Sequence, residues 1–223
     1  MIEGANHASV TEPYEKFAGP GYIGEIARRH LPNDLQAEVS RLVDPAAATE
    51  TVHWGRNYLY VTELHTRSGP LEVVVKQFRN QGWWKVLDRR LRGSKAERGW
   101  RAAIAIADAG IPTPEPIVLV ESDRRDGPSF FVSRRLHGAS EVRHFFRRLN
   151  GESGASDFPA VDEFSFLRQL GGFCRRLHDA GIWYRDLSMG NVLAVSRADE
   201  DLELWLVDCN RARTGCRLGT VRR

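Results

Sequence analysis

The distribution of apolar residues in the first part of the chain is typical of short β-strands. Turn residues such as Ser68-Gly69-Pro70 separate the strand-like runs. The strand-like runs lie at about 50–54, 58–65, 71–78, 117–121 and 130–135. Helical spacing of apolar residues predicts a short helix over 33–43 and a longer one over 94–109.

After Leu136 the pattern changes to helical periodicity. A short basic helix is expected over 141–149, and a long amphipathic helix over 162–180. Two short strands, at about 192–196 and 203–207, flank the turn SRADED. The change in pattern predicts three parts: an amino-terminal extension (1–49), a strand-rich lobe (50–138) and a partial helix-rich lobe (139–223), which has a basic tail from about 211.

The composition is that of a soluble globular protein, with 42% hydrophobic and 27% charged residues among 223. No apolar run reaches about 18 residues, so we expect no membrane-spanning helix. The amino terminus lacks the basic and apolar regions of a signal peptide. Three cysteines without metal-ligand spacing favour a reduced, cytoplasmic setting.

The net charge of +3 conceals two basic segments. The last thirteen residues hold five arginines and no acid, so residues 1–210 carry a net charge of −2. Residues 83–101 hold seven lysines or arginines against two acids. These segments are either a solvated face with a charged tail or a surface that attracts anions such as phosphorylated lipid headgroups. The tail lacks interleaved aromatics, so we expect no nucleic-acid partner.

Five residues in the order Lys76, Glu97, Asp186, Asn191 and Asp208 suit phosphoryl transfer. That reaction needs a cation for the phosphates, oxygen ligands for magnesium and a carboxylate facing the acceptor hydroxyl. Lys76 follows three valines at a strand end, a position that favours the cleft over a solvent-exposed lysine.

Glu97 has two interpretations. In the stretch SKAE it would complete a capping box with Ser94 at a helix start. It also precedes Trp100 and Ile104 on the apolar side of the predicted helix, where a carboxylate needs a partner, and Lys76 is the obvious one. We expect the Lys76–Glu97 ion pair, which requires the helix to begin before Ser94.

The five residues and their surroundings resemble the protein-kinase fold. The stretch YRDLSMGN matches the catalytic loop H-R-D-L-x-x-x-N, with Tyr184 at the histidine position. VVVK matches the strand lysine, and VDCN occupies the position of D-F-G. The resemblance implies an α+β, protein-kinase-like two-lobed fold, with a strand-rich N-lobe containing one helix and a truncated helix-rich C-lobe.

Within that fold the chain most resembles the lipopolysaccharide core kinases, the Kdo and heptose kinases of Gram-negative bacteria. The resemblance covers about 50–213 and rests on three stretches: KAERGWRAAIAIADAGIPTPEPI, RLHDAGIWYRDLSMGNVL and VDCNRAR. It implies that Asp186 is the catalytic base and that Lys76 contacts the phosphates of ATP and pairs with Glu97. It also implies that Asn191 and Asp208 bind Mg²⁺.

The same resemblance implies a partner and a location. The acceptor would be a sugar hydroxyl of the lipopolysaccharide core glycolipid, and the basic stretch 83–101 would meet this polyanionic substrate. The enzyme would be cytoplasmic and peripheral at the inner membrane.

Besides Tyr184, three positions and the short carboxy end depart from the protein-kinase pattern. Gly55 stands alone where protein kinases have three glycines, and Asn210 replaces the glycine of D-F-G. Ser188 stands where Ser/Thr kinases carry a lysine, which argues against a protein substrate. Only fifteen residues follow Asp208, so the long helix 162–180 is expected to expose apolar residues unless a protein partner completes the lobe. The alternatives are an atypical Ser/Thr protein kinase and a truncated pseudokinase that acts as a binding module.

Overall fold

The computed structural model describes residues 14–54, 57–79, 93–124, 126–152, 158–185, 187–197 and 202–216. Its largest element is an antiparallel sheet of seven strands in the order β1-β2-β6-β7-β5-β4-β3. The strands are β1 (Tyr14–Gly19), β2 (Tyr22–Ala27), β3 (Glu50–Trp54), β4 (Asn57–Thr66), β5 (Gly69–Phe78), β6 (Pro116–Ser122) and β7 (Ser129–Arg134). The five strands predicted from the strand-like runs are all present, and their bounds lie within two residues of the predicted ones.

The hairpin β1–β2 is an addition to the sequence prediction, which placed no strand before residue 50. It extends the sheet because β2 pairs antiparallel with β6. Helix α1 (Leu35–Leu42) follows and packs Val39 and Leu42 into the same apolar cluster as the central strands. The division of the chain at 49/50 and 138/139 remains a prediction.

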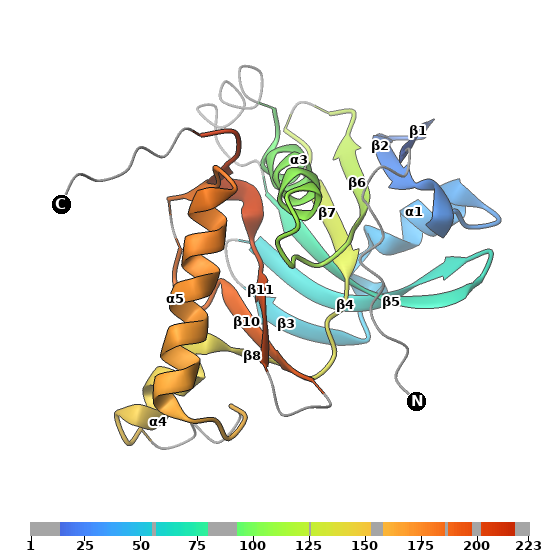
Figure 1. Cartoon of the computed structure of the whole chain (residues 1–223). Coiled ribbons are helices and arrows are strands. Elements are labelled where there is room, and N and C mark those ends of the chain that lie inside the picture. Colours follow the sequence, from blue (N-terminus) through green and yellow to red (C-terminus); the bar gives the residue numbers. More distant parts are fainter. Residues whose placement is uncertain are drawn as a thin grey trace.

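Helix α3 (Lys95–Asp108) lies against the large sheet (Figure 1) and contributes residues to two apolar clusters. Its first turns pack Ala96 and Trp100 against Phe78 and Leu119 of the sheet. Further along, Ala103 and other residues of α3 join the core of the second half. Because α3 packs into both clusters, it fixes the sheet and the helix-rich half of the molecule relative to each other.

The second half consists of helices around a small sheet, as the change of periodicity predicts. Its elements are β8 (Ala139–Glu141), α4 (Val142–Leu149), α5 (Glu163–Asp179), β9 (Trp183–Tyr184), β10 (Val192–Ser196), β11 (Leu202–Leu206), the 3-10 turn η4 (Cys209–Arg211) and β12 (Ala212–Arg213). Strands β11, β10 and β8 form one sheet, and β12 pairs with β9. The expected α+β architecture, with a strand-rich lobe and a helix-rich lobe, is confirmed.

Helix α5 buries one side and exposes the other, on the side of the molecule away from β1 and β2 (Figure 1). Phe166, Phe173 and Leu177 are buried in the second core. Phe164 and Leu167 point outward, with 67% and 44% of their surface exposed. Within the described part of the chain, no helix is both long and apolar enough to span a membrane.

Glu115 ties the amino-terminal segment to the central sheet. Its Oε1 lies 2.6 Å from His30 Nε2 and accepts a hydrogen bond of 2.8 Å from Arg29 Nε, while Oε2 accepts one of 2.9 Å from Arg134. Burial alone would raise the pKa of Glu115, but the hydrogen bonds and charges of His30, Arg29 and Arg134 lower this pKa to about 2. The folded state therefore favours the ionised carboxylate.

We expect Glu115→Gln to lower the free energy of unfolding by roughly 2–3 kcal/mol at pH 7, allowing for screening of the partly exposed Arg29. The pKa in the folded state lies below the ordinary 4.5, so the wild-type advantage is complete above about pH 4.5 and is lost as the pH falls toward 2. Urea unfolding of both proteins at several pH values measures this difference. Glu15→Gln is the control. Among the described residues, the Glu15 carboxylate lies 3.7 Å from Arg28 Nε, and both side chains are largely exposed. Equal unfolding free energies for wild type and Glu115→Gln at pH 7 would contradict the prediction.

Candidate functional site

The candidate site lies where the end of β5 meets the loop after β11. Lys76, near the end of β5, extends its ammonium group to Asp208, and Nζ lies 2.6 Å from Oδ1. The lysine is therefore directed at Asp208 rather than at solvent, and its function in the site stays a prediction. The contact brings together one residue from the strand-rich lobe and one from the helix-rich lobe.

Asp208 has a left-handed backbone conformation, which residues other than glycine rarely adopt. With φ 59° and ψ 46° it is the one non-glycine residue with positive φ in the described segments. Such strain typically costs 1–3 kcal/mol and persists only where surrounding contacts impose it. Asn210 Nδ2 donates a hydrogen bond of 2.5 Å to Asp208 Oδ1, so the residue that replaces the glycine of D-F-G orients the carboxylate.

Tyr184 holds the backbone of Asp208 from the opposite side. Its hydroxyl donates to the carbonyl oxygen of Asp208 at 2.5 Å and lies 3.3 Å from the carbonyl oxygen of Val207. Burial, followed by the charge of Asp208, raises the pKa of Tyr184 far above its usual range, so the hydroxyl keeps its proton. Tyr184 thus has an anchoring function at the position where the sequence motif has histidine.

The end of β11 is fixed by the loop that follows α3. Leu206 N donates to Pro112 O at 2.8 Å, and Thr113 Oγ1 donates to Leu206 O at 2.8 Å. Cys209 is fully buried next to Thr113, and burial raises the pKa of its thiol to about 12. It acts as a small apolar group and is no thiolate nucleophile.

Asn191 is positioned by two backbone hydrogen bonds. Its N–H donates to Ser188 O at 2.9 Å, and its carbonyl accepts from Val207 N at 2.9 Å. The second bond joins Asn191 directly to Val207, the residue before Asp208. Asn191 and Asp208 consequently line the same cavity, of about 260 Å³. The other lining residues are Phe78, Lys95, Arg98, Tyr184, Asn210 and Arg211.

The cavity offers oxygen ligands that fit magnesium, which prefers one or two carboxylates and related oxygens. Both contacts of Asp208 described above are made by Oδ1, so among the described residues Oδ2 accepts no hydrogen bond or ion pair. An amide oxygen and this carboxylate oxygen would hold the ion together with phosphate oxygens. Asp186, the predicted base, lies outside the described residues.

The expected Lys76–Glu97 ion pair is wrong. Among the described residues, the carboxylate of Glu97 pairs with Arg101 at 2.5 Å, while Lys76 contacts Asp208. Ser94 is the N-cap of α3 and accepts a hydrogen bond of 2.9 Å from Glu97 N. The helix therefore begins at Lys95, and Glu97 takes the third position of a capping box rather than a position over the cleft.

Gly99 occupies the side of α3 that faces the candidate site. A Cβ atom placed on Gly99 would lie 3.5 Å from Asn210 Cβ. This turn of the helix therefore faces the segment that contains Asp208 and Asn210, and it presents a glycine there rather than a carboxylate. The first turn instead places Lys95 and Arg98 in the cavity wall. Sequence reasoning included both cations in the basic stretch 83–101 but assigned neither to the site. Residues three apart on a helix are neighbours on its surface, so the spacing of Lys95 and Arg98 was the signal that they share one wall.

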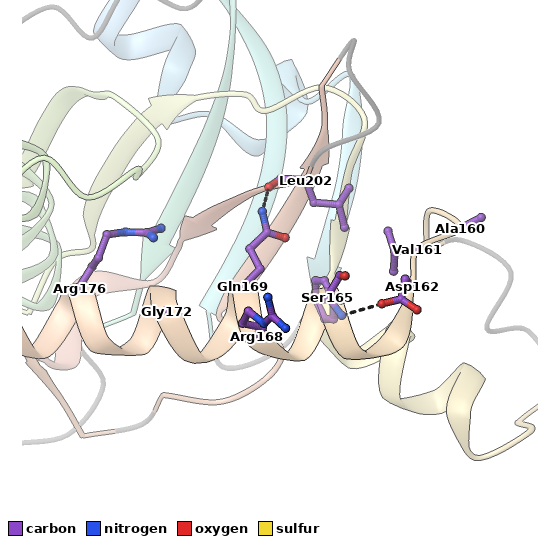
Figure 2. Close-up of a pocket in the computed structure, with 10 residues that line it drawn as sticks. Ala160, Val161, Asp162, Ser165, Arg168, Gln169, Gly172, Arg176 and Leu202 are labelled. Atoms are coloured by element: carbon purple, nitrogen blue, oxygen red, sulfur yellow. Dashed lines mark hydrogen bonds between the residues drawn. The ribbon is translucent and has the colours of Figure 1, made fainter.

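A second cavity, of about 550 Å³, lies along α5 and contains none of the predicted site residues. Arg168, Gln169 and Arg176 line it from the helix, and Gln169 donates a hydrogen bond to Leu202 O (Figure 2). Asp162 lines its edge but caps α5 by accepting a hydrogen bond of 2.8 Å from Ser165 N. In this cavity the carboxylate of Asp162 caps a helix and the amide of Gln169 binds Leu202 O, so we take the smaller cavity, which contains Asn191 and Asp208, as the candidate site.

Comparison with known families connects this geometry to a protein class. The model of the lipopolysaccharide kinase (Kdo/WaaP) family matches residues 60–222, a range that includes all five predicted site residues. A search of curated proteins finds no match to the chain.

We expect Tyr184→Phe to destabilise the protein by about 1–3 kcal/mol, because the carbonyl of Asp208 loses its buried donor. For a chain of this size that lowers the melting temperature by roughly 2–4 °C per kcal/mol, which differential scanning calorimetry measures. Tyr22→Phe is the matched control, because Tyr22 is half-buried on β2 and its hydroxyl makes no hydrogen bond to the described residues, so this variant should melt near the wild-type temperature. A melting temperature of Tyr184→Phe equal to that of wild type would show that the hydroxyl does not hold Asp208.

Proposed function

Because the chain belongs to the lipopolysaccharide kinase (Kdo/WaaP) family, we propose that it transfers the γ-phosphoryl group of ATP to a sugar hydroxyl of the lipopolysaccharide inner core. The observation that carries the proposal is the 2.6 Å contact of Lys76 with Asp208, in a cleft whose cavity Asn191 also lines. A phosphate-binding cation and two magnesium ligands thereby lie within one small site.

The proposed chemistry assigns each residue a task. Lys76 binds the nucleotide phosphates, and Asn191 and Asp208 hold Mg²⁺, which neutralises negative charge on the phosphates. As the oxygen of the acceptor hydroxyl bonds to the γ-phosphorus, Asp186 accepts the proton of that hydroxyl. The bond from that phosphorus to the bridging oxygen breaks, and the electron pair leaves with ADP. Tyr184 and Asn210 keep the Asp208 carboxylate oriented throughout.

The acceptor class follows from the family and from Ser188. Ser/Thr protein kinases carry a lysine at that position, so its absence favours a sugar acceptor over a protein. We propose a Kdo or heptose residue as the acceptor. Such a glycolipid is held in a membrane, so the enzyme would work as a peripheral protein at the inner-membrane surface.

The decisive experiment incubates the protein with γ-³²P-ATP, Mg²⁺ and purified dephosphorylated inner-core glycolipid. Label in the glycolipid supports the proposal. Label in added protein substrates alone would replace it with the protein-kinase alternative, and no transfer to any acceptor would favour a binding module.

Asp186→Asn should abolish phosphate transfer, because the amide accepts no proton at neutral pH. Nucleotide binding should be retained, since the phosphates are held by other residues. Asp179→Asn is the control, because Asp179 pairs with Arg175 on the exposed end of α5. Transfer at the wild-type rate by Asp186→Asn would exclude Asp186 as the base.

Asp208→Asn should remove the magnesium-dependent part of nucleotide binding. Mg-ATP at a hundred times its dissociation constant stabilises a protein by about 2.7 kcal/mol, which raises the melting temperature by several degrees. We expect this rise in wild type and Asp179→Asn, and only the rise produced by ATP without magnesium in Asp208→Asn. Equal magnesium dependence in all three proteins would contradict the assignment of Asp208 as a metal ligand.

A further inference from the structure

The first turn of α3 places two cations in the wall of the candidate site. Lys95 and Arg98 are three residues apart on the helix, and both line the 260 Å³ cavity that Asn191 and Asp208 also line. The family resemblance assigned the whole basic stretch 83–101 to the polyanionic acceptor and gave neither residue a nucleotide-binding function.

Local contacts fix this turn in place. Ser94 caps the helix, and Arg98 Nη1 donates a hydrogen bond of 2.9 Å to Gly93 O. This bond ties the guanidinium group to the loop before the helix. Ala96, between the two cations, is buried against the sheet core, so the turn cannot rotate without breaking that packing.

Three cations and one carboxylate are among the described residues that line the cavity. The cations are Lys95, Arg98 and Arg211, and the carboxylate is Asp208. A ligand that carries several negative charges can therefore contact more than one cation in this cavity. The cavity has the volume of about nine water molecules, so a group bound to the metal ligands on one wall also lies close to the cations on the other. The phosphates that share Mg²⁺ with Asp208 are such a group.

The sequence lacks the usual phosphate-binding loop of protein kinases. That loop covers the phosphates with three closely spaced glycines, whereas residues 52–61 contain Gly55 alone. Backbone donors from a glycine-rich turn are therefore in short supply, and side-chain cations are the alternative source of hydrogen bonds to phosphate.

We propose that Lys95 and Arg98 of α3 bind the phosphate tail of the nucleotide, in place of a glycine-rich loop. The inference rests on the proposed function, since it presumes that ATP occupies the cleft. It adds two nucleotide-binding residues on the helix from which a partner carboxylate for Lys76 was expected.

The test measures nucleotide affinity by isothermal titration calorimetry with Mg-ATP, Mg-ADP and adenosine. The proteins are wild type, Lys95→Gln, Arg98→Gln and the double variant. Each single change should weaken ATP binding on the order of tenfold, equivalent to about 1.4 kcal/mol. The loss should be smaller for ADP, which lacks the γ-phosphate, and absent for adenosine. Arg98→Lys should recover part of the affinity, because it keeps the charge but loses the planar donors.

Arg101→Gln is the matched control. Arg101 lies one turn from Glu97 on the same helix, with 76% of its side chain exposed, and pairs with that residue. This variant removes the same charge outside the cavity, and its ATP affinity should equal that of wild type. Melting temperatures without ligand verify that every variant is folded.

The outcomes separate this inference from the proposed function. No binding of Mg-ATP by folded wild type would refute the nucleotide site itself and with it the inference. Binding by wild type and equally tight binding by the double variant would overturn the inference alone. The same result together with a raised KM for the glycolipid would overturn it in another way, by assigning the two cations to an acid group of the acceptor.

Discussion

The contact between Lys76 and Asp208 is the interaction on which the candidate site depends, because it is made across the two lobes. Asp208 reaches Lys76 from a left-handed backbone conformation that is costly for a residue with a side chain. Three neighbours maintain this conformation: Tyr184 binds its carbonyl, Asn210 binds its carboxylate, and the backbone of Asn191 holds the preceding residue. Each of these contacts comes from the helix-rich half. The strand-rich half contributes the lysine, so neither lobe has the site without the other.

The described lining of the cavity contains oxygen atoms and cations from different elements. Asp208, after β11, and Asn191 contribute the oxygen atoms, while the first turn of α3 contributes Lys95 and Arg98. If the proposed Mg²⁺ and nucleotide phosphates bind there, the phosphates would share the metal with the oxygen atoms and would also contact the cations. A helix that placed Glu97 in the cleft would instead have added a negative charge facing the phosphates.

The amino-terminal segment and the central helix connect the sheet to its surroundings. Glu115 joins the residues after β2 to the end of β7 through Arg29, His30 and Arg134, and α3 packs into both cores. The exposed residues Phe164 and Leu167 on α5 lie on the opposite side from its core-facing residues, so they do not contribute to that framework.

The sequence by itself determined the helices, the longer strands and the order of the reactive residues, because hydrophobic periodicity is a local property. Strands 50–54 and 192–196 occur at their predicted bounds, and α5 differs by one residue at each end. Strands of two or three residues, such as β9 and β12, are too short to show a period, and the hairpin β1–β2 acquires its place by pairing with β6, far along the chain. Only the tertiary structure decided which carboxylate Lys76 contacts. Glu97 and Asp208 were both available, but Ser94 caps α3 and directs Glu97 toward Arg101, while packing in the other lobe brings Asp208 to the lysine.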